Sequence, residues 1–117
     1  MPNLVMEYTH SVDERINVQS LLEDLHTVLI KSEYFALTSI KSRAIRLHHW
    51  LVGDLADSVD FIHLTLEPLA GLTDEQKSIL SAALMAVLSQ QALHVQSLTI
   101  NIRDMDPLCF AKETHFS

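Results

Sequence analysis

The sequence predicts an α+β fold in which two βαβ units form one four-stranded sheet with two helices on one face. Two amphipathic helical stretches are each flanked by strand-like apolar runs. The second half repeats the order of the first, with Leu4 corresponding to Ile62 and Ile40 to Leu98, an offset of about 58 residues. The 117 residues are enough for one domain with a single core, which we expect to span 1–117.

The first half of this pattern covers residues 2–52. From Val18 the apolar residues recur at intervals of three and four, which is typical of an amphipathic helix with one buried face. The expected elements are a strand over 3–8, a helix ending near Ser32 or Glu33, and a strand over 39–50. Side chains alternate between the faces of a strand, so Lys41, Arg43 and Ile45 should lie opposite Ile40, Ser42 and Ala44.

The second half covers residues 59–104 and is followed by a tail over 105–117. A strand is expected over 61–66, and Thr73 with Gln76 forms a capping-box pattern at the start of a helix. Its predicted apolar stripe is Ile79, Leu80, Ala83, Leu84, Val87 and Leu88. A last strand is expected over 97–104, and Leu108, Phe110 and Phe116 are candidate anchors for the tail.

Both helices cover the same face of the predicted sheet, because each βαβ unit pairs two parallel strands through a right-handed crossover. The other sheet face therefore has no helix to cover it. We expect Val5, Ile45, Leu47, Phe61 and Leu66 to make this face apolar. Such a surface predicts an oligomer in which the uncovered faces pack together.

Composition excludes several classes of partner. The net charge is −7, and the acidic residues are spread along the chain, which argues against a nucleic-acid-binding surface. Binding of an anionic small molecule is still possible, because it needs only a few local cations. No signal-peptide pattern is present and no apolar run is long enough to span a bilayer, so we expect no membrane partner. Cys109 is the only cysteine, which fits a reducing cytoplasm.

The seven histidines show no familiar zinc spacing, so we expect no metal. His48 and His49 are adjacent on the expected strand and should point to opposite faces. His63, in a strand, is expected to be a hydrogen-bonded residue of the core or of a subunit interface. Cys109 has no histidine at a recognisable spacing that would make it a nucleophile.

Pro2 directly follows the initiator Met1 and precedes the first strand. If Met1 is removed, Pro2 carries a free secondary amine, and an ordinary α-amino group has a pKa of roughly 7.7–8.0. A dry pocket and nearby cations disfavour the charged amine, which makes it a usable proton-transfer base near neutral pH. The alternative is that Pro2 is simply a residue at the second position, where a missing N–H has no cost.

Several of these stretches together resemble the 5-carboxymethyl-2-hydroxymuconate isomerase family of the tautomerase superfamily. The similarity runs from Pro2 to about Asp104. It rests on Met1-Pro2 leading into a strand, on Ile40-Lys41-Ser42-Arg43, on Phe61-Ile62-His63-Leu64-Thr65-Leu66 and on Ala70-Gly71. The resemblance implies a homotrimer with a tautomerase-like fold, no metal and no cofactor.

The resemblance also implies where the active-site residues fall. Pro2 would be the catalytic base, and Lys41 and Arg43 would bind the substrate. Lys41 stands where relatives have arginine, so it keeps the charge but loses the fork that grips a carboxylate. Leu72 stands where relatives tend to have a second arginine, and Glu67 adds a negative charge nearby.

The implied activity is a cofactor-free allylic proton transfer on a carboxylate-bearing dienol such as 5-carboxymethyl-2-hydroxymuconate. Two alternatives stay open at this stage: a trimeric binding module without catalysis, and a tautomerase of a different small enol acid. The alternative interpretation of Lys41 and Arg43 is that they are ordinary surface cations, or ion-pair partners of Glu7 and Glu67.

Overall fold

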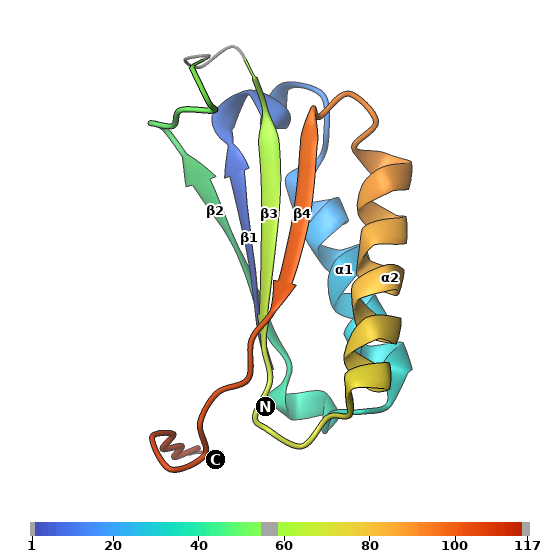
Figure 1. The fold of residues 1–117 in the computed structure, drawn as a ribbon, viewed down its shortest axis with the longest axis vertical. Helices are drawn as coiled ribbons and strands as arrows, with labels where there is room; N and C mark the ends of the chain where they lie inside the picture. The colour runs from blue at the N-terminus through green and yellow to red at the C-terminus, as the bar shows by residue number, and fades with distance from the viewer. Residues whose placement is uncertain (1, 55–58, 116–117) are drawn as a thin grey trace.

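The computed structural model describes residues 2–54 and 59–115, and the helices lie on one side of a single sheet (Figure 1). The first unit consists of β1 (Asn3–Thr9), α1 (Val18–Ser32) and β2 (Lys41–Leu47). The second consists of β3 (Phe61–Glu67), α2 (Asp74–Gln91) and β4 (Ser97–Ile102). Two short 3-10 turns, η1 (His10–Glu14) and η2 (Leu37–Ser39), flank the first helix. The predicted α+β fold is confirmed.

The four strands are ordered β2-β1-β3-β4. Within each unit the strands are parallel, as the crossover rule predicts: β1 pairs with β2 and β3 with β4. The two units meet through β1 and β3, which are antiparallel. In this register Val5 lies between Arg43 on one side and Thr65 on the other.

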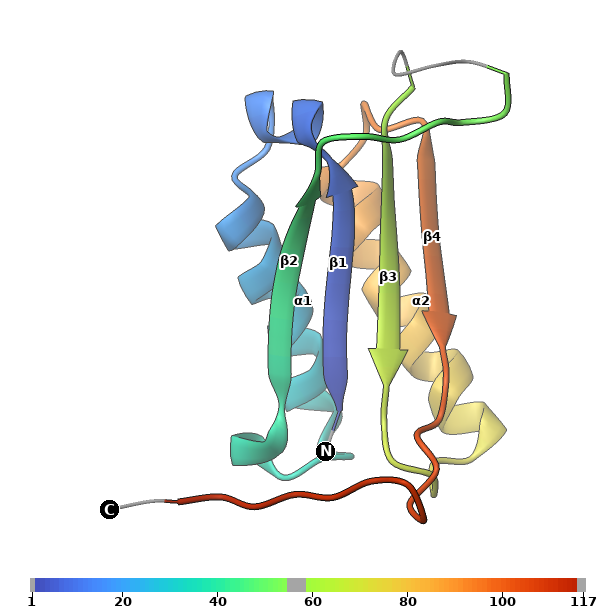
Figure 2. The same cartoon turned by 90° about the vertical axis from the view of Figure 1, so that its left-hand side faces the viewer.

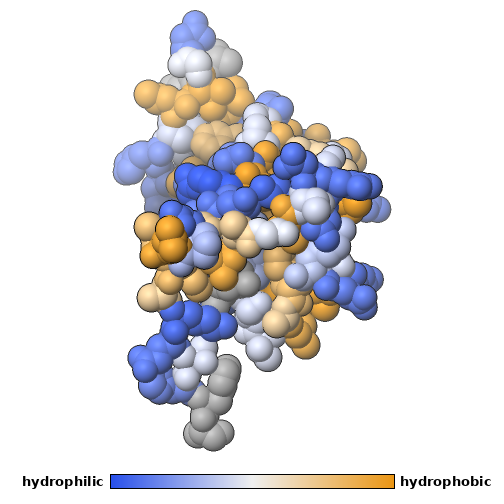
Figure 3. Space-filling model, turned by 60° about the horizontal axis from the view of Figure 1, so that its bottom comes forward, coloured by the Kyte–Doolittle hydropathy of each residue, from blue (hydrophilic) through white to orange (hydrophobic). Residues whose placement is uncertain are grey.

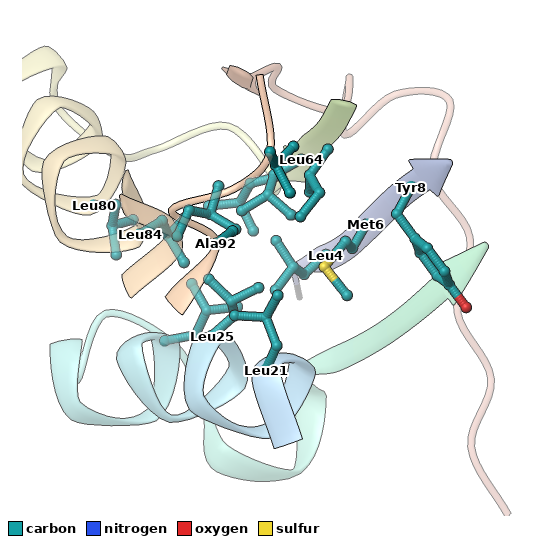
Figure 4. Packing of buried hydrophobic residues seen from close by; sticks show 14 of the residues in the cluster. Leu4, Met6, Tyr8, Leu21, Leu25, Leu64, Leu80, Leu84 and Ala92 are labelled. Atoms are coloured by element: carbon teal, nitrogen blue, oxygen red, sulfur yellow. The ribbon is translucent and has the colours of Figure 1, made fainter. Parts of the chain in front are cut away.

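The core lies between the sheet and the two helices, where side chains from both units meet (Figure 4). The strands contribute Leu4, Met6, Ile62, Leu64 and Leu66, and the helices contribute Leu21, Leu25, Leu29, Leu80, Leu84 and Leu88. These eleven side chains are at most 1% exposed. Burial of both apolar stripes against one sheet face supplies the main drive for folding.

Two assignments to faces were wrong. Leu66 was expected on the uncovered face but is 0% exposed beneath the helices. The reason is strand alternation, because Leu66 is five positions from Phe61 and therefore on the opposite face. Ile79 was expected in the buried stripe of α2 but is 52% exposed, because the buried positions recur at Leu80 and every fourth residue after it.

Both helices begin with side-chain caps. The Asn17 side chain accepts a hydrogen bond from the Ser20 N–H at 3.0 Å. At α2 the predicted capping box is confirmed: the Gln76 N–H donates to Thr73 Oγ1 at 3.1 Å, and the Thr73 N–H donates to Gln76 Oε1 at 2.9 Å. These bonds satisfy backbone donors that the first helical turn leaves free.

Strand β2 is shorter than predicted at both ends. At its start Ser39 belongs to η2, where its hydroxyl donates to the Ala36 carbonyl at 2.6 Å. After Leu47 the chain leaves the sheet, and the His48 ring stacks on His10 with centroids 6.1 Å apart. His48 and His49 therefore lie beyond the strand, and the expectation that they alternate on it was wrong.

The face of the sheet opposite the helices is uncovered in the single chain (Figure 2). Val5, Ile45, Leu47 and Phe61 share this face, as predicted, and Ile45 is 41% exposed. His63 lies on the same face, where its Nδ1 is 2.6 Å from Thr99 Oγ1. The open face thus combines apolar residues with hydrogen-bonded polar side chains.

Within residues 2–54 and 59–115, no helix has the length and apolar character needed to cross a membrane.

Candidate active site

Two of the predicted site residues, Pro2 and Lys41, are neighbours at the start of β1. Pro2 is buried, and its carbonyl oxygen accepts a hydrogen bond from the Lys41 N–H at 3.2 Å. The parallel ladder continues from this bond, pairing Asn3 with Lys41. The backbones of Pro2 and Lys41 are therefore direct neighbours, although 39 positions separate them in the sequence.

Lys41 and Arg43 both lie on the open face, as their spacing of two on a strand requires. Their side chains are exposed, and in the register Lys41 lies next to Asn3 and Arg43 next to Val5. The structure thus places two cations in sequence along the strand that starts beside Pro2. An anionic ligand at this edge of the sheet would meet both charges.

A pocket of about 290 Å³ opens at the same end of the sheet. Figure 3 turns this end toward the viewer and shows polar and apolar residues intermixed on it. One wall comes from the starts of β1 and β2, and the other comes from the C-terminal tail. The lining residues are Asn3, Lys41, Phe110, Ala111, Lys112 and Glu113.

The negative charge of Glu67 has a partner. Its Oε2 lies 3.0 Å from Arg103 Nη2, and Glu67 pairs in register with Asn3. The ion pair is partly exposed and adds little to stability, but it offsets a carboxylate that would otherwise repel an anion. Arg103 has this role in the single chain.

Leu72, by contrast, brings no charge to the site. It is half-buried and packs against the core cluster. Together with Tyr34, Phe35 and Gly71 it lines a separate pocket of about 250 Å³. The position at which relatives tend to carry a second arginine is therefore apolar here.

Sequence reasoning missed Lys112, which lies in the tail and lines the pocket with Lys41. The tail has no periodicity that places its residues, and Leu108, a candidate anchor, is 93% exposed. Phe110 is half-buried at the pocket, whereas Phe116 lies outside the described residues. Only the path of the tail reveals this second lysine.

No group of three or more histidine, cysteine, aspartate or glutamate side chains that could hold a metal occurs in the described part of the chain. Two histidines do lie together: the His10 ring stacks on that of His48, and it contacts Trp50 edge-on with ring centroids 5.0 Å apart. This cluster lies at the opposite end of β1 from Pro2.

Comparison with solved structures identifies the fold, which is tautomerase-like. A fused 4-OT structure described as a symmetric trimer superimposes with a TM-score of 0.70 at 20% identity, covering 95% of this chain and 93% of its own. A macrophage migration inhibitory factor-like protein from Entamoeba histolytica gives a TM-score of 0.72 at 13% identity, covering 96% of this chain and 95% of its own. At these identities the likeness concerns the fold alone.

The family follows from the sequence profile described as 5-carboxymethyl-2-hydroxymuconate isomerase, which matches residues 2–113. The chain belongs to this family of isomerases. A 5-carboxymethyl-2-hydroxymuconate isomerase from Deinococcus radiodurans R1 is 27% identical, with a TM-score of 0.85 and coverage of 97% of this chain and 90% of that one. A search of curated proteins found no match. The recognised resemblance is confirmed.

Proposed function

We propose that this isomerase catalyses a cofactor-free allylic proton transfer on a carboxylate-bearing dienol, with the amine of Pro2 as the base. A substrate such as 5-carboxymethyl-2-hydroxymuconate fits the family and the local charge. The proposal requires that Met1 be removed so that the Pro2 nitrogen is free.

The single observation that carries the proposal is the backbone bond from Lys41 to the Pro2 carbonyl, 3.2 Å long. It holds a cationic strand beside the proposed base, with Arg43 two residues further on the same face. Pro2 is buried, and burial and nearby positive charge are the two conditions that favour the neutral form of an amine, which accepts a proton.

In the proposed reaction, the neutral Pro2 nitrogen removes the proton from the dienol hydroxyl. The electrons of the O–H bond form the C=O bond of the ketone, and the double bond shifts along the allylic unit. The protonated nitrogen then returns the proton to the carbon at the other end of that unit. Lys41 and Arg43 hold the substrate carboxylate and stabilise the negative charge that develops between the two transfers. No redox change and no co-reactant is required.

The proposed active form is a homotrimer in the cytoplasm, with residues 1–117 as one domain. The fused 4-OT structures of the same fold are described as symmetric trimers. The apolar side chains on the open sheet face, among them Ile45 and Phe61, provide a surface that packing against other subunits would bury.

The test compares three untagged preparations by the ultraviolet change that accompanies ketonisation of a 2-hydroxymuconate-type acid. The first is the protein whose intact mass shows that Met1 is absent, and the second is the same chain with Met1 retained. The third is Pro2→Ala, also processed. We expect the first to exceed the other two in kcat by roughly 10²- to 10⁴-fold, the usual contribution of a positioned general base.

Retention of Met1 is the sharper control, because it leaves every side chain in place and blocks only the amine. Equal rates with and without Met1 would refute Pro2 as the base. A processed protein with no rate above buffer, on this acid or on shorter enol acids, would instead favour a binding module of the same fold.

A further inference from the structure

Directly after β4, the C-terminal tail is bonded to the segment that follows β3, at the end of the sheet where β1 begins. The Met105 N–H donates to the Pro68 carbonyl at 2.7 Å, and Met105 forms an isolated parallel bridge with Leu69. One residue earlier, the Asp104 carboxylate lies 2.9 Å from Lys77 Nζ on α2. These contacts fix the point from which the tail departs.

A turn then redirects the tail. The Leu108 N–H donates to Asp106 Oδ1 at 2.9 Å, and the Cys109 N–H donates to the Asp106 carbonyl at 3.0 Å. Beyond this turn the tail runs below the sheet from the side of β4, past the start of β1, to the side of β2 (Figure 2). Its residues 110–113 thereby reach the pocket beside Asn3 and Lys41.

The tail brings a second ammonium group to this pocket, that of Lys112, across from Lys41. Glu113 also lines the pocket, but its Oε2 is 3.5 Å from His115 Nε2, a partner whenever that imidazole is protonated. The side chain of Asn3 is oriented by a contact of 3.9 Å between its Nδ2 and Met105 Sδ. The pocket thus presents two lysines, one carboxylate and an amide at one end of the sheet.

A dienol with two carboxylates needs positive charge at two places. We propose that Lys112 binds the carboxylate farther from the reacting carbon, while Lys41, whose backbone adjoins Pro2, binds the nearer one. This inference rests on the proposed function and assigns to its site a substrate with at least one carboxylate beyond the one nearest the reacting carbon. A lysine on a flexible stem suits this task, because its compact charge tolerates a range of carboxylate positions. It also supplies a charge that Leu72 does not.

The test measures kcat and KM for Lys112→Gln with two substrates: a 2-hydroxymuconate-type dicarboxylate and a 2-hydroxydienoate that lacks the distal carboxylate. We expect KM for the dicarboxylate to rise about tenfold, the effect of losing one charge-assisted hydrogen bond in a partly solvated site. KM for the monocarboxylate and both kcat values should stay within twofold. Lys112→Arg should restore most of the affinity for the dicarboxylate.

Two further variants separate the local effect from net charge. Lys31→Gln also removes one positive charge, but from a side chain that lies between the two helices, near Ile79 and away from the pocket. It should leave both KM values unchanged. Glu113→Gln removes an anion from the pocket and should lower KM for the dicarboxylate. A purely electrostatic effect of net charge would instead make Lys31→Gln resemble Lys112→Gln.

Failure of this inference is distinguishable from failure of the proposed function. A wild-type protein that isomerises the dicarboxylate but loses nothing in Lys112→Gln would overturn the role of Lys112 alone. An equal rise of KM for both substrates would also overturn it, because the distal carboxylate would not be the group bound. A wild-type protein inactive on both substrates would refute the proposed function itself.

Discussion

Replacement of Ile45 by aspartate should dissociate the proposed homotrimer while leaving each subunit folded. Ile45 lies near the middle of β2 on the open sheet face, in register with Glu7. Its side chain is 41% exposed in the single chain, so the core does not depend on it. An aspartate here would put a carboxylate, next to that of Glu7, into the surface proposed to pack between subunits.

The size of the effect follows from burial. Complete burial of an isoleucine side chain stabilises by about 1.5–3 kcal/mol, so the exposed 41% accounts for about 0.6–1.2 kcal/mol per subunit if the interface covers it. Burying an unpaired carboxylate in its place costs about 3 kcal/mol or more after relaxation. The sum of about 4 kcal/mol weakens association roughly a thousandfold per subunit.

The assay is light scattering or sedimentation at micromolar concentration, with circular dichroism to confirm folding. Ile79→Asp is the matched control, because Ile79 is 52% exposed but lies on α2, away from the open face. We expect a monomer for Ile45→Asp and the wild-type mass for Ile79→Asp. Identical masses for the two variants would refute packing through this face, and a monomeric wild type would refute the oligomer.

Two further predictions concern stability. Thr73→Ala removes the acceptor for the Gln76 N–H at the start of α2, and should lower the free energy of unfolding in urea by about 1 kcal/mol; no loss would mean that water replaces the cap. Burial, together with the charge of Asp13 and a hydrogen bond to it, raises the pKa of Tyr8 above its ordinary value of 10.0. The stabilisation from the protonated Tyr8 hydroxyl is complete below pH 10 and is lost as pH rises through the higher pKa of the folded state. The loss occurs because Tyr8 releases its proton more readily in the unfolded chain. Urea titrations of wild type and Tyr8→Phe at pH 8 and above pH 10 should show a steeper alkaline loss in the wild type, and parallel losses would contradict this reasoning.

The part of the proposed site that depends on a single strand was predictable from the sequence. Lys41 and Arg43 share a face because they are two residues apart on β2, which alternation alone predicts. The ion pair of Glu67 with Arg103 was not predictable in this way. It joins residues 36 apart through the register of β3 against β4, which no local pattern specifies.

Local patterns in the sequence were sufficient for the strand and helix types, for the capping box at Thr73 and for the parallel pairing within each unit, because these depend on neighbours within a few residues and on chain handedness. Alternation along β3 also puts Leu66 on the face opposite Phe61, so the expectation that both lie on the open face went against a local pattern. Lys112 shows where such patterns end. Its place beside Lys41 depends on the turn at Asp106 and on the path of an aperiodic tail, and only tertiary contacts determine such a path.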